Sequence, residues 1–309
     1  MSDTVETSLA TWGLVAADYE FVAGRENRVF RVRSGQGDFA LRIKRPGYRE
    51  KDELVSELYW LDAMETGGLH VPRPLLSRNG KLLECVDGFF VDIVSWLPGV
   101  PLGKSRHPLA LENRHAIFHA IGAEMARLHA ACDTWDRPAD FRRCHWDIDG
   151  LLGDAPVWGR FWTNPTLSDD TRKLFLRFRE AATDRLTELL PGLDYGLIHA
   201  DLVRENILLD GQTLKLIDFD DGGFGYRQFD IATVLLKNMT EPDFPDLKAA
   251  LIEGYLNRRA LDLTSLDIFT TIRALSYVGW IVPRMDEPGG TLRNERFIAE
   301  ARDLCNAFL

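Results

Sequence analysis

The chain has 309 residues, 45% of them hydrophobic and 27% charged, with a formal net charge of −10 and a pI near 5.3. This acidic balance argues against nucleic acid or an anionic membrane as a partner, because both require a cationic surface. No apolar run reaches the roughly 18 residues of a membrane helix, no leader pattern opens the chain, and the cysteines form no CxxC pair. We therefore expect a cytoplasmic protein, and its length favours two lobes.

The first part of the chain is predicted to form an antiparallel sheet with one helix. Residues 20–45 contain three stretches rich in aromatic and branched side chains, with SGQG as a turn between the last two. From Lys51 to Thr66 apolar residues then recur at helical spacing, which predicts a helix: Leu54, Leu58, Leu61 and Met64. Gly67 closes this helix, and the stretches KLLECV and FFVDIVSWL follow as two more strands around Asp87-Gly88, a tight-hairpin signal.

The chain changes character after Trp96, where Pro98, Gly99 and Pro101 interrupt the strands. We therefore expect one domain over residues 1–97 and a second over residues 98–309. Helical periodicity dominates the second domain, over residues 117–128, 174–189, 226–240, 246–259, 264–282 and 294–308.

One acidic segment, HADLVRENILLDGQTLKLIDFDD from His199 to Asp221, interrupts these helices. NILL and TLKLID flank a turn, which predicts a hairpin with Asn206 and Asp218 at the ends away from that turn. Strand alternation would point Asp218 and Asp220 the same way. Two carboxylates about 4 Å apart repel by roughly 4 kcal/mol at an effective dielectric near 20, so their convergence is unfavourable without a compensating cation or proton. Oxygen ligands without cysteine or paired histidine suit magnesium, which commonly accompanies phosphate.

The spacing His199-x-Asp201-x4-Asn206, followed by Asp218 twelve residues later, resembles the catalytic and metal-binding segments of the protein-kinase-like fold. The spacing is that of aminoglycoside phosphotransferases and choline kinases. The resemblance implies an α+β fold of two lobes, with an N-terminal nucleotide-binding lobe and a mostly helical C-terminal lobe. It also implies that Asp201 deprotonates the acceptor hydroxyl, while Asn206 and Asp218 hold the Mg²⁺ that bridges the phosphates of ATP. Asp220 would add a further contact or bind a second ion.

The same resemblance implies roles for three further residues. His199 would brace the catalytic loop. Ala200 departs from the family, in which small-molecule kinases usually carry glycine, and it puts no catalytic group in doubt. Asp230 resembles the aspartate that accepts hydrogen bonds from the catalytic loop, and the alternative is an acid that only favours a helix N-terminus.

The resemblance implies a phosphate-binding apparatus in the first lobe. The turn Gly24-Arg25-Glu26-Asn27 could cover the nucleotide, although it lacks GxGxxG. FALRIKR resembles the VAIK strand of kinases and places Arg42 at the lysine position, with Lys44 as the alternative cation on the same face.

Two further positions in the first lobe follow from the family pattern. Glu57 is expected to be the ion-pair partner of the strand cation, with Glu53 as its competitor. Residues 94–99 resemble the adenine hinge, where the backbone at Ser95 and Leu97 would bond the base.

The expected function is ATP- and Mg²⁺-dependent transfer of the γ-phosphoryl group to a hydroxyl of a small, amine-bearing acceptor. Three alternatives stay open. A protein Ser/Thr kinase of the bacterial stress-response type is the closest of them, and the absence of an APE-like motif after GFG lowers its weight without excluding it. A non-catalytic scaffold would have lost Asp201 or a metal ligand. A phosphatase of the haloacid-dehalogenase type would need Thr or Val near Gly222-Gly223.

The acceptor itself is not identified by the motif. Aromatic and acidic residues lie where related kinases build the acceptor pocket, and they suit an ammonium group: Trp135, Trp146, Trp158 and Trp162 with Asp147, Asp149 and Asp154. Trp280 and Arg284 could reach the same region, although packing explains the tryptophans equally well. His115 and His119 have the spacing of a zinc pair on a helix, but a plain helix face is the simpler interpretation. The oligomeric state is left open.

Overall fold

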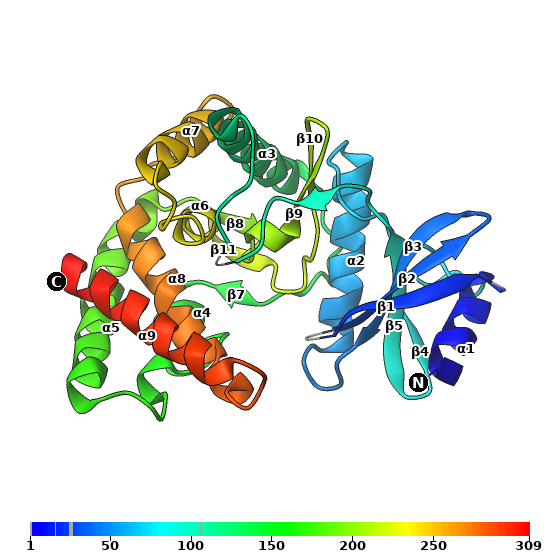
Figure 1. Ribbon diagram of the computed structural model, residues 1–309, viewed down its shortest axis with the longest axis horizontal. Helices are drawn as coiled ribbons and strands as arrows, with labels where there is room; N and C mark the ends of the chain where they lie inside the picture. The colour runs from blue at the N-terminus through cyan, green and yellow to red at the C-terminus, as the bar shows by residue number, and fades with distance from the viewer. Residues whose placement is uncertain (1, 16, 25–26, 106) are drawn as a thin grey trace. The chain divides into compact units, whose positions relative to one another are not determined.

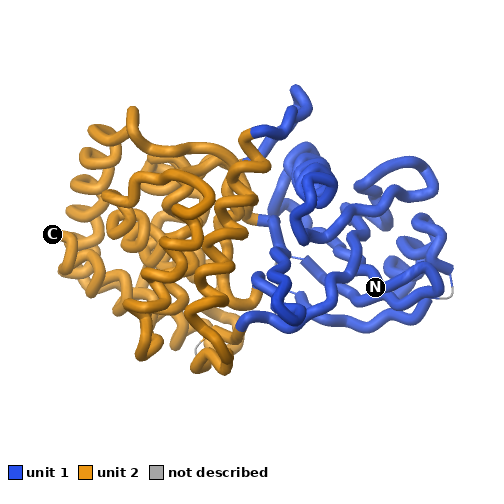
Figure 2. The backbone as a smooth tube through the Cα atoms, turned by 90° about the horizontal axis from the view of Figure 1, so that it is seen from above, with its two compact units in different colours: residues 1–102, 134–143, 206–220 blue, residues 103–133, 144–205, 221–309 orange. Residues whose placement is uncertain are grey.

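The computed structural model describes residues 2–15, 17–24, 27–105 and 107–309. It divides into two compact units, coloured separately in Figure 2. The first comprises Met1–Leu102, Thr134–Arg143 and Asn206–Asp220, and the second comprises Gly103–Asp133, Cys144–Glu205 and Asp221–Leu309. The first unit therefore takes in two segments from beyond residue 97, because the acidic hairpin and a short connecting stretch pack with it.

The first unit contains the predicted antiparallel sheet (Figure 1). Its strands are β1 (Asp18–Gly24), β2 (Asn27–Ser34), β3 (Gly37–Lys44), β4 (Glu84–Val86) and β5 (Phe89–Ser95), in the order β1-β2-β3-β5-β4. All neighbouring strands are antiparallel, and β4 and β5 form the hairpin expected at Asp87-Gly88. Asp87 and Gly88 both have positive φ angles, which such a tight turn requires. The expectation of about five strands is confirmed.

The two faces of this sheet have different partners. Alternate residues of β3 (Phe39, Leu41 and Ile43) join an apolar cluster with Val5, Leu9 and Trp12 of helix α1 (Ser2–Trp12). Arg42 and Lys44, which alternate with these residues, point to the opposite face and reach Glu57 of helix α2 (Lys51–Thr66). Figure 1 shows α1 and α2 on opposite sides of the sheet. The sequence pattern predicts one helix in this part of the chain, and α1 is a second helix that it does not predict.

Helix α2 has the predicted bounds and ends at Gly67 as expected. Its N-terminus is a capping box, in which the Glu50 side chain accepts from the Glu53 backbone and the Glu53 side chain accepts from the Glu50 backbone. The cap fixes the start of the helix, and with it the register that places Glu57 against the sheet. Trp60, one turn further along, is fully buried and meets the Phe219 ring edge to face.

The acidic hairpin is formed by β9 (Ile207–Asp210) and β10 (Thr213–Leu216), and β9 also pairs with the short β6 (Val100–Pro101). Asn206 precedes β9, and its carbonyl accepts the amide of Ile217 at 3.0 Å, so the two ends of the hairpin are adjacent as predicted. One detail of the prediction is wrong. β10 ends at Leu216 and Asp218 has a φ of +67°, so strand alternation does not relate the directions of Asp218 and Asp220.

The second unit is mostly helical, as expected. The remaining helices are α3 (Arg114–Thr134), α4 (Ile148–Leu152), α5 (Asp169–Leu189), α6 (Arg227–Leu236), α7 (Phe244–Leu256), α8 (Leu266–Trp280) and α9 (Gly290–Phe308). Short 3₁₀ turns cover η1 (Phe161–Thr163), η2 (Leu190–Gly192), η3 (Arg204–Asn206) and η4 (Val282–Arg284). Strand β11 (Gly223–Tyr226) pairs in parallel with β7 (His145–Trp146) and antiparallel with β8 (Tyr195–Ile198). Over the described part of the chain, no helix is long and apolar enough to cross a membrane.

Candidate active site

The loop that carries Asp201 begins where β8 ends, and a single buried carboxylate holds it. Asp230, in the first turn of α6, accepts the backbone N–H of His199 at 2.8 Å and that of Ala200 at 2.6 Å. Ala200 has a φ of +64°, a left-handed conformation that glycine adopts without strain. The prediction that Asp230 accepts hydrogen bonds from this loop is confirmed, and the residue that departs from the family pattern, Ala200, adopts this left-handed conformation.

A buried histidine supports that carboxylate in turn. His129 on α3 is fully buried, with Nε2 3.1 Å from Asp230 and Nδ1 2.8 Å from the Tyr255 hydroxyl. Burial lowers the pKa of His129, which fits a neutral ring that donates to Asp230 and accepts from Tyr255. Burial alone would raise the pKa of Asp230, but the hydrogen bonds from His129 and the loop backbone hold that pKa below its ordinary value. Asp230 therefore stays ionised and fixes the loop.

Asp201 lies among other charged side chains of the second unit. Arg273 on α8 donates from Nη2 to Oδ1 of Asp201 at 2.6 Å and to the Tyr277 hydroxyl at 2.8 Å. Burial raises the pKa of Asp201, Arg273 opposes that increase, and the net pKa lies above its ordinary value. Asp221 raises this pKa further, while Lys237 lowers it. A raised carboxylate pKa beside a buried cation is typical of a general base.

Lys237 completes this charged group. Its ammonium lies 3.5 Å from the centre of the Tyr277 ring, which stacks in turn on Phe297 at 5.0 Å. Burial lowers the pKa of Lys237 to about 7, and repulsion from Arg273 adds to the decrease. The neighbourhood of Asp201 therefore contains two cations and, in Asp221, a second carboxylate.

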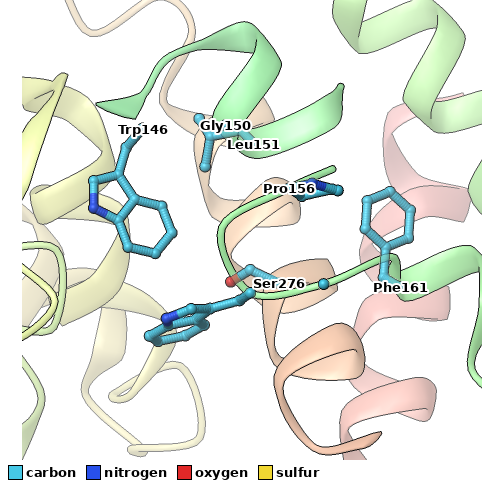
Figure 3. Close-up of a pocket in the computed structure, with 8 residues that line it drawn as sticks. Trp146, Gly150, Leu151, Pro156, Phe161 and Ser276 are labelled. Carbon is cyan, nitrogen blue, oxygen red and sulfur yellow. The ribbon is translucent and has the colours of Figure 1, made fainter. Parts of the chain in front are cut away.

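Of the four predicted acceptor-pocket tryptophans, two lie near Asp221. The indole of Trp158 donates to Oδ1 of Asp221 at 3.2 Å, and that of Trp146 donates to its backbone carbonyl at 2.9 Å. Both rings border a small packing gap with Ser276 of α8 (Figure 3). Trp135 packs on Phe141 in the first unit, and Trp162 stacks on Arg179.

The protein's own cations already occupy several of these aromatic faces. Arg273 lies 4.2 Å from the Trp158 ring centre and 4.4 Å from that of Tyr277, and Arg284 lies 4.3 Å from Trp280. An acceptor ammonium placed on those rings would meet like charge. The three predicted aspartates line a separate surface depression of about 530 Å³ together with His145: Asp147, Asp149 and Asp154. Two of them already have partners, because Asp147 caps α4 and Asp154 bonds Arg179.

The first unit holds a buried ion cluster on its α2 side. Arg42 donates from Nη1 to Glu57 at 2.8 Å and from Nε to Asp92 at 2.6 Å. Lys44 Nζ lies 3.1 Å from Asp220, 3.3 Å from Asp92 and 3.6 Å from Glu57. The ion pair predicted between Arg42 and Glu57 is present, whereas the competitor Glu53 pairs with Arg49. Which of the two cations contacts phosphate stays a prediction.

Mutual attraction keeps this cluster charged although it is buried. Burial opposes ionisation of Asp220, but Lys44 and Arg42 hold its pKa well below the ordinary value. Burial also opposes the charge of Arg42, but Asp92 and Glu57 raise its pKa above the usual range. Arg143 lies 3.9 Å from Glu57 and donates to the carbonyls of Phe219 and Asp220, so three cations face three carboxylates.

Of the other predicted nucleotide contacts, Asn27 reaches this cluster. The Asn27 side-chain amide donates to Asp220, while Gly24 ends β1. Arg25 and Glu26, between them, lie outside the described residues. The Ser95 amide donates to the carbonyl of Arg73 at 2.8 Å, so it is already engaged, and Leu97 follows the end of β5. The adenine hinge stays a prediction.

The candidate metal ligands are oxygen donors of the kind that magnesium takes. Among the described residues, no group of three or more His, Cys, Asp or Glu side chains could hold a metal ion by itself. Asn206 and Asp218 offer an amide and a carboxylate oxygen at adjacent ends of the hairpin. Magnesium in nucleotide enzymes is commonly held by one or two carboxylates together with phosphate oxygens. The zinc interpretation has no support, because His119 bonds Asn257 on a helix surface.

Comparison with known proteins decides the family. A family model described as the phosphotransferase enzyme family matches residues 19–267, which is more than half of the chain. The chain belongs to this family. The predicted resemblance is therefore confirmed, and the haloacid-dehalogenase alternative is not supported.

Individual relatives of this phosphotransferase agree with the assignment. A solved microcompartment-associated aminopropanol kinase superposes with a TM-score of 0.86 at 26% identity, covering 100% of this chain and 97% of that one. The amicoumacin kinase of Bacillus subtilis is 28% identical over 80% of this chain and 71% of its own length. A homoserine kinase of Gluconobacter oxydans is 29% identical over 84% and 79%. The α+β kinase-like fold expected from the motif is thereby confirmed.

Sequence reasoning missed several residues of this phosphotransferase site. Asp92 is a lone acid within the apolar strand FFVDIVSWL and lies opposite Arg42 in the β3–β5 register, so the strand itself contained a signal. Arg273, Lys237 and Asp221 gave no comparable signal. They come from different elements, and only the packing of α6 and α8 brings Lys237 and Arg273 near Asp201.

Proposed function

We propose that this phosphotransferase moves the γ-phosphoryl group of ATP to a hydroxyl of a small, amine-bearing acceptor, with Mg²⁺ as the accompanying ion. In the reaction, the acceptor oxygen forms a bond to the γ-phosphorus while the bond from that phosphorus to the bridging oxygen breaks. ADP leaves, and the hydroxyl proton passes to Asp201 and then to solvent. When bound, the ion would neutralise charge on the phosphates, and Asn206 and Asp218 would hold it, with Asp220 as a further candidate.

One observation supports the role of Asp201 more than any other. Its loop is held by two backbone hydrogen bonds to Asp230, and its carboxylate combines a raised pKa with a hydrogen bond from Arg273. A base that must take a proton from an alcohol near neutral pH benefits from both a fixed position and a raised pKa.

The nature of the acceptor is inferred chiefly from the relatives. Aminopropanol and homoserine, named for two of them, are small compounds that carry both a hydroxyl and an amine. Asp221 would offer the acceptor's ammonium a carboxylate close to Asp201, whereas the stacked aromatic rings would not, because the protein's own cations occupy them. A protein substrate remains the second candidate, although the three named relatives are kinases of small molecules.

For nucleotide binding, Arg42, Lys44 and Glu57 would position the phosphates. Gly24 and Asn27 would border the loop above them, and the backbone at Ser95 and Leu97 would bond the base. Because Ser95 already donates its amide, Leu97 is the stronger candidate of the two.

The Asp201→Asn substitution tests the assigned base. We expect turnover to fall by a factor of about 10² to 10⁴, because the amide cannot accept the proton. The affinity for ATP should stay within about twofold, since the proposed nucleotide contacts lie on other residues. Steady-state ADP release and calorimetric titration with Mg-ATP measure the two effects.

The matched control is Asp210→Asn in the hairpin turn, where Asp210 pairs with Lys215. That variant should keep near-normal turnover. Full activity of the Asp201 variant, or a collapse of its ATP affinity, would show that the role is wrongly assigned.

A further inference from the structure

The environment of Arg273 is unusual for an arginine. Its side chain is fully buried, its Nη2 donates to Asp201 and Tyr277, and its guanidinium lies over the rings of Trp158 and Tyr277. Its Nε and Nη1 are buried without a hydrogen-bond partner. Buried polar groups nearly always have partners in native proteins, so the two bare nitrogens call for an explanation.

Stability alone does not explain this arrangement. Removing a guanidinium from water is costly, and hydrogen bonds to one carboxylate and one hydroxyl, with Nε and Nη1 unsatisfied, do not compensate fully. The contacts with the aromatic rings offset only part of that cost. An apolar side chain of similar volume at this position of α8 would serve packing as well or better. We therefore look for the role of this cation in its contact with the Asp201 carboxylate.

Resting on the function proposed for Asp201, we propose that Arg273 is the positioning residue of the general base. By holding Oδ1 through Nη2, it sets the plane in which the carboxylate meets the acceptor hydroxyl. Its charge also favours the ionised form of Asp201 in a partly buried setting that raises the pKa of the acid. Trp158 and Tyr277 hold Arg273 in turn, because its guanidinium carbon lies 4.2 Å and 4.4 Å from their ring centres and Nη2 donates to the Tyr277 hydroxyl.

The sign of the effect on the base follows from the charges around it. Asp201 faces the cations Arg273 and Lys237, the carboxylate Asp221 and the ring of His199. Burial and Asp221 raise the pKa of Asp201, and Arg273 is the strongest opposing group. Removing Arg273 therefore raises that pKa further. The base is then ionised only at higher pH. On a plot of kcat/KM against pH, the part where activity rises with pH, here called the acidic limb, must therefore move to higher pH.

The test compares Arg273→Met and Arg273→Lys with the unsubstituted enzyme over a pH series. For Arg273→Met we expect kcat to fall about 100-fold and the acidic limb to move up by about one pH unit. Arg273→Lys keeps the positive charge but loses the planar guanidinium. Its acidic limb should therefore lie near that of the unsubstituted enzyme, while its kcat should be about 10-fold lower. Affinity for Mg-ATP should be unchanged in both variants.

Two controls separate this role from a structural one. Arg227 is another fully buried arginine of the second unit, paired with Asp133, and Arg227→Met should lower stability without moving the acidic limb. Lys237, whose pKa is about 7, titrates in the same range. The Arg273 series is therefore repeated with Lys237→Met, where the shift should persist.

The outcomes are distinguishable. Activity that survives Asp201→Asn overturns the proposed function. Loss of activity in Arg273→Met with an unmoved limb overturns the positioning role alone. If Arg273→Met does not fold, Arg273→Gln and Arg273→Lys test the positioning role instead. Because Gln is neutral, an acidic limb that does not move in Arg273→Gln would also contradict that role.

Discussion

At the scale of single residues, Asp230 holds the loop that carries Asp201. Its two oxygens receive the consecutive amides of His199 and Ala200, and Oδ2 also meets His129. Consecutive amides can converge on one carboxylate when the backbone turns through a left-handed residue, and Ala200 provides that turn. The loop geometry thus depends on a charge located on α6.

We predict that Asp230→Asn lowers the free energy of unfolding by about 3 kcal/mol, because the buried amides and His129 lose an ionised acceptor. Urea unfolding measures the loss. The control is Asp262→Asn, an exposed aspartate that also accepts a backbone amide, where the unfolding midpoint in urea should stay close to that of the original protein.

The same residue sets a pH dependence. The folded-state pKa of Asp230 lies below its ordinary value, so its stabilising contribution is fully present above the unfolded-state pKa of about 3.9 and is lost as pH falls toward the folded-state value. The difference in stability between the original protein and the Asn variant should therefore shrink below about pH 4. A difference that is constant down to pH 3 would contradict the assignment.

At the scale of elements, the sequence predicted what local pattern determines. The bounds of α2 followed from a run of apolar residues at helical spacing closed by glycine, and the hairpins followed from Asp87-Gly88 and Asp210-Gly211. Helix α1 was missed because its apolar residues are few and its Ser and Thr residues are weak helix formers, so packing on the sheet decides its structure.

Side-chain contacts between distant elements were less predictable. Arg42 and Glu57 could be paired from the family pattern, but Asp92, Lys44 and Asp220 meet only because β3, β5 and the end of the hairpin come together in the first unit. Asp218 was misplaced because the alternation rule was extended beyond the end of β10. Hydrophobic periodicity predicts individual helices and strands. The charged side chains that meet in this ion cluster depend on how those helices and strands pack together.

The contact between α3 and α7 gives a prediction about element packing. An ideal Cβ on Gly122 of α3 would lie 2.0 Å from the carbonyl oxygen of Leu251, and one on Gly254 of α7 would lie 1.9 Å from that of His119. The two backbones can approach this closely only with glycine at both positions. Gly122→Ala should lower the free energy of unfolding by about 1–3 kcal/mol, as overpacking does in a dense core.

Gly192→Ala is the control for that substitution, because an added Cβ there meets no atom within 4 Å. Its unfolding midpoint in urea should stay close to that of the original protein. Equal midpoints for the Gly122 and Gly192 variants would mean that α3 and α7 are not held at this distance.

At the scale of the whole molecule, the proposed roles divide between the two units. The residues proposed for nucleotide and metal lie in the first unit, whereas Asp201, Asp230 and Arg273 lie in the second. The division falls between Glu205 and Asn206, within the family motif itself, so one short stretch of chain contributes to both units. Changes in the second unit are therefore expected to alter turnover and acceptor use more than ATP affinity.

The central claim is phosphoryl transfer from ATP to a small amino alcohol with Asp201 as the base. The most direct measurement is ADP release by the purified protein with Mg-ATP and a panel of amino alcohols, hydroxy amino acids, sugars and peptides, with mass spectrometry of the products. We predict acceptor-dependent ADP release and a phosphorylated amino alcohol, both lost without Mg²⁺ and in Asp201→Asn. Phosphorylation of peptides alone, or transfer that persists in the Asn variant, would contradict the account.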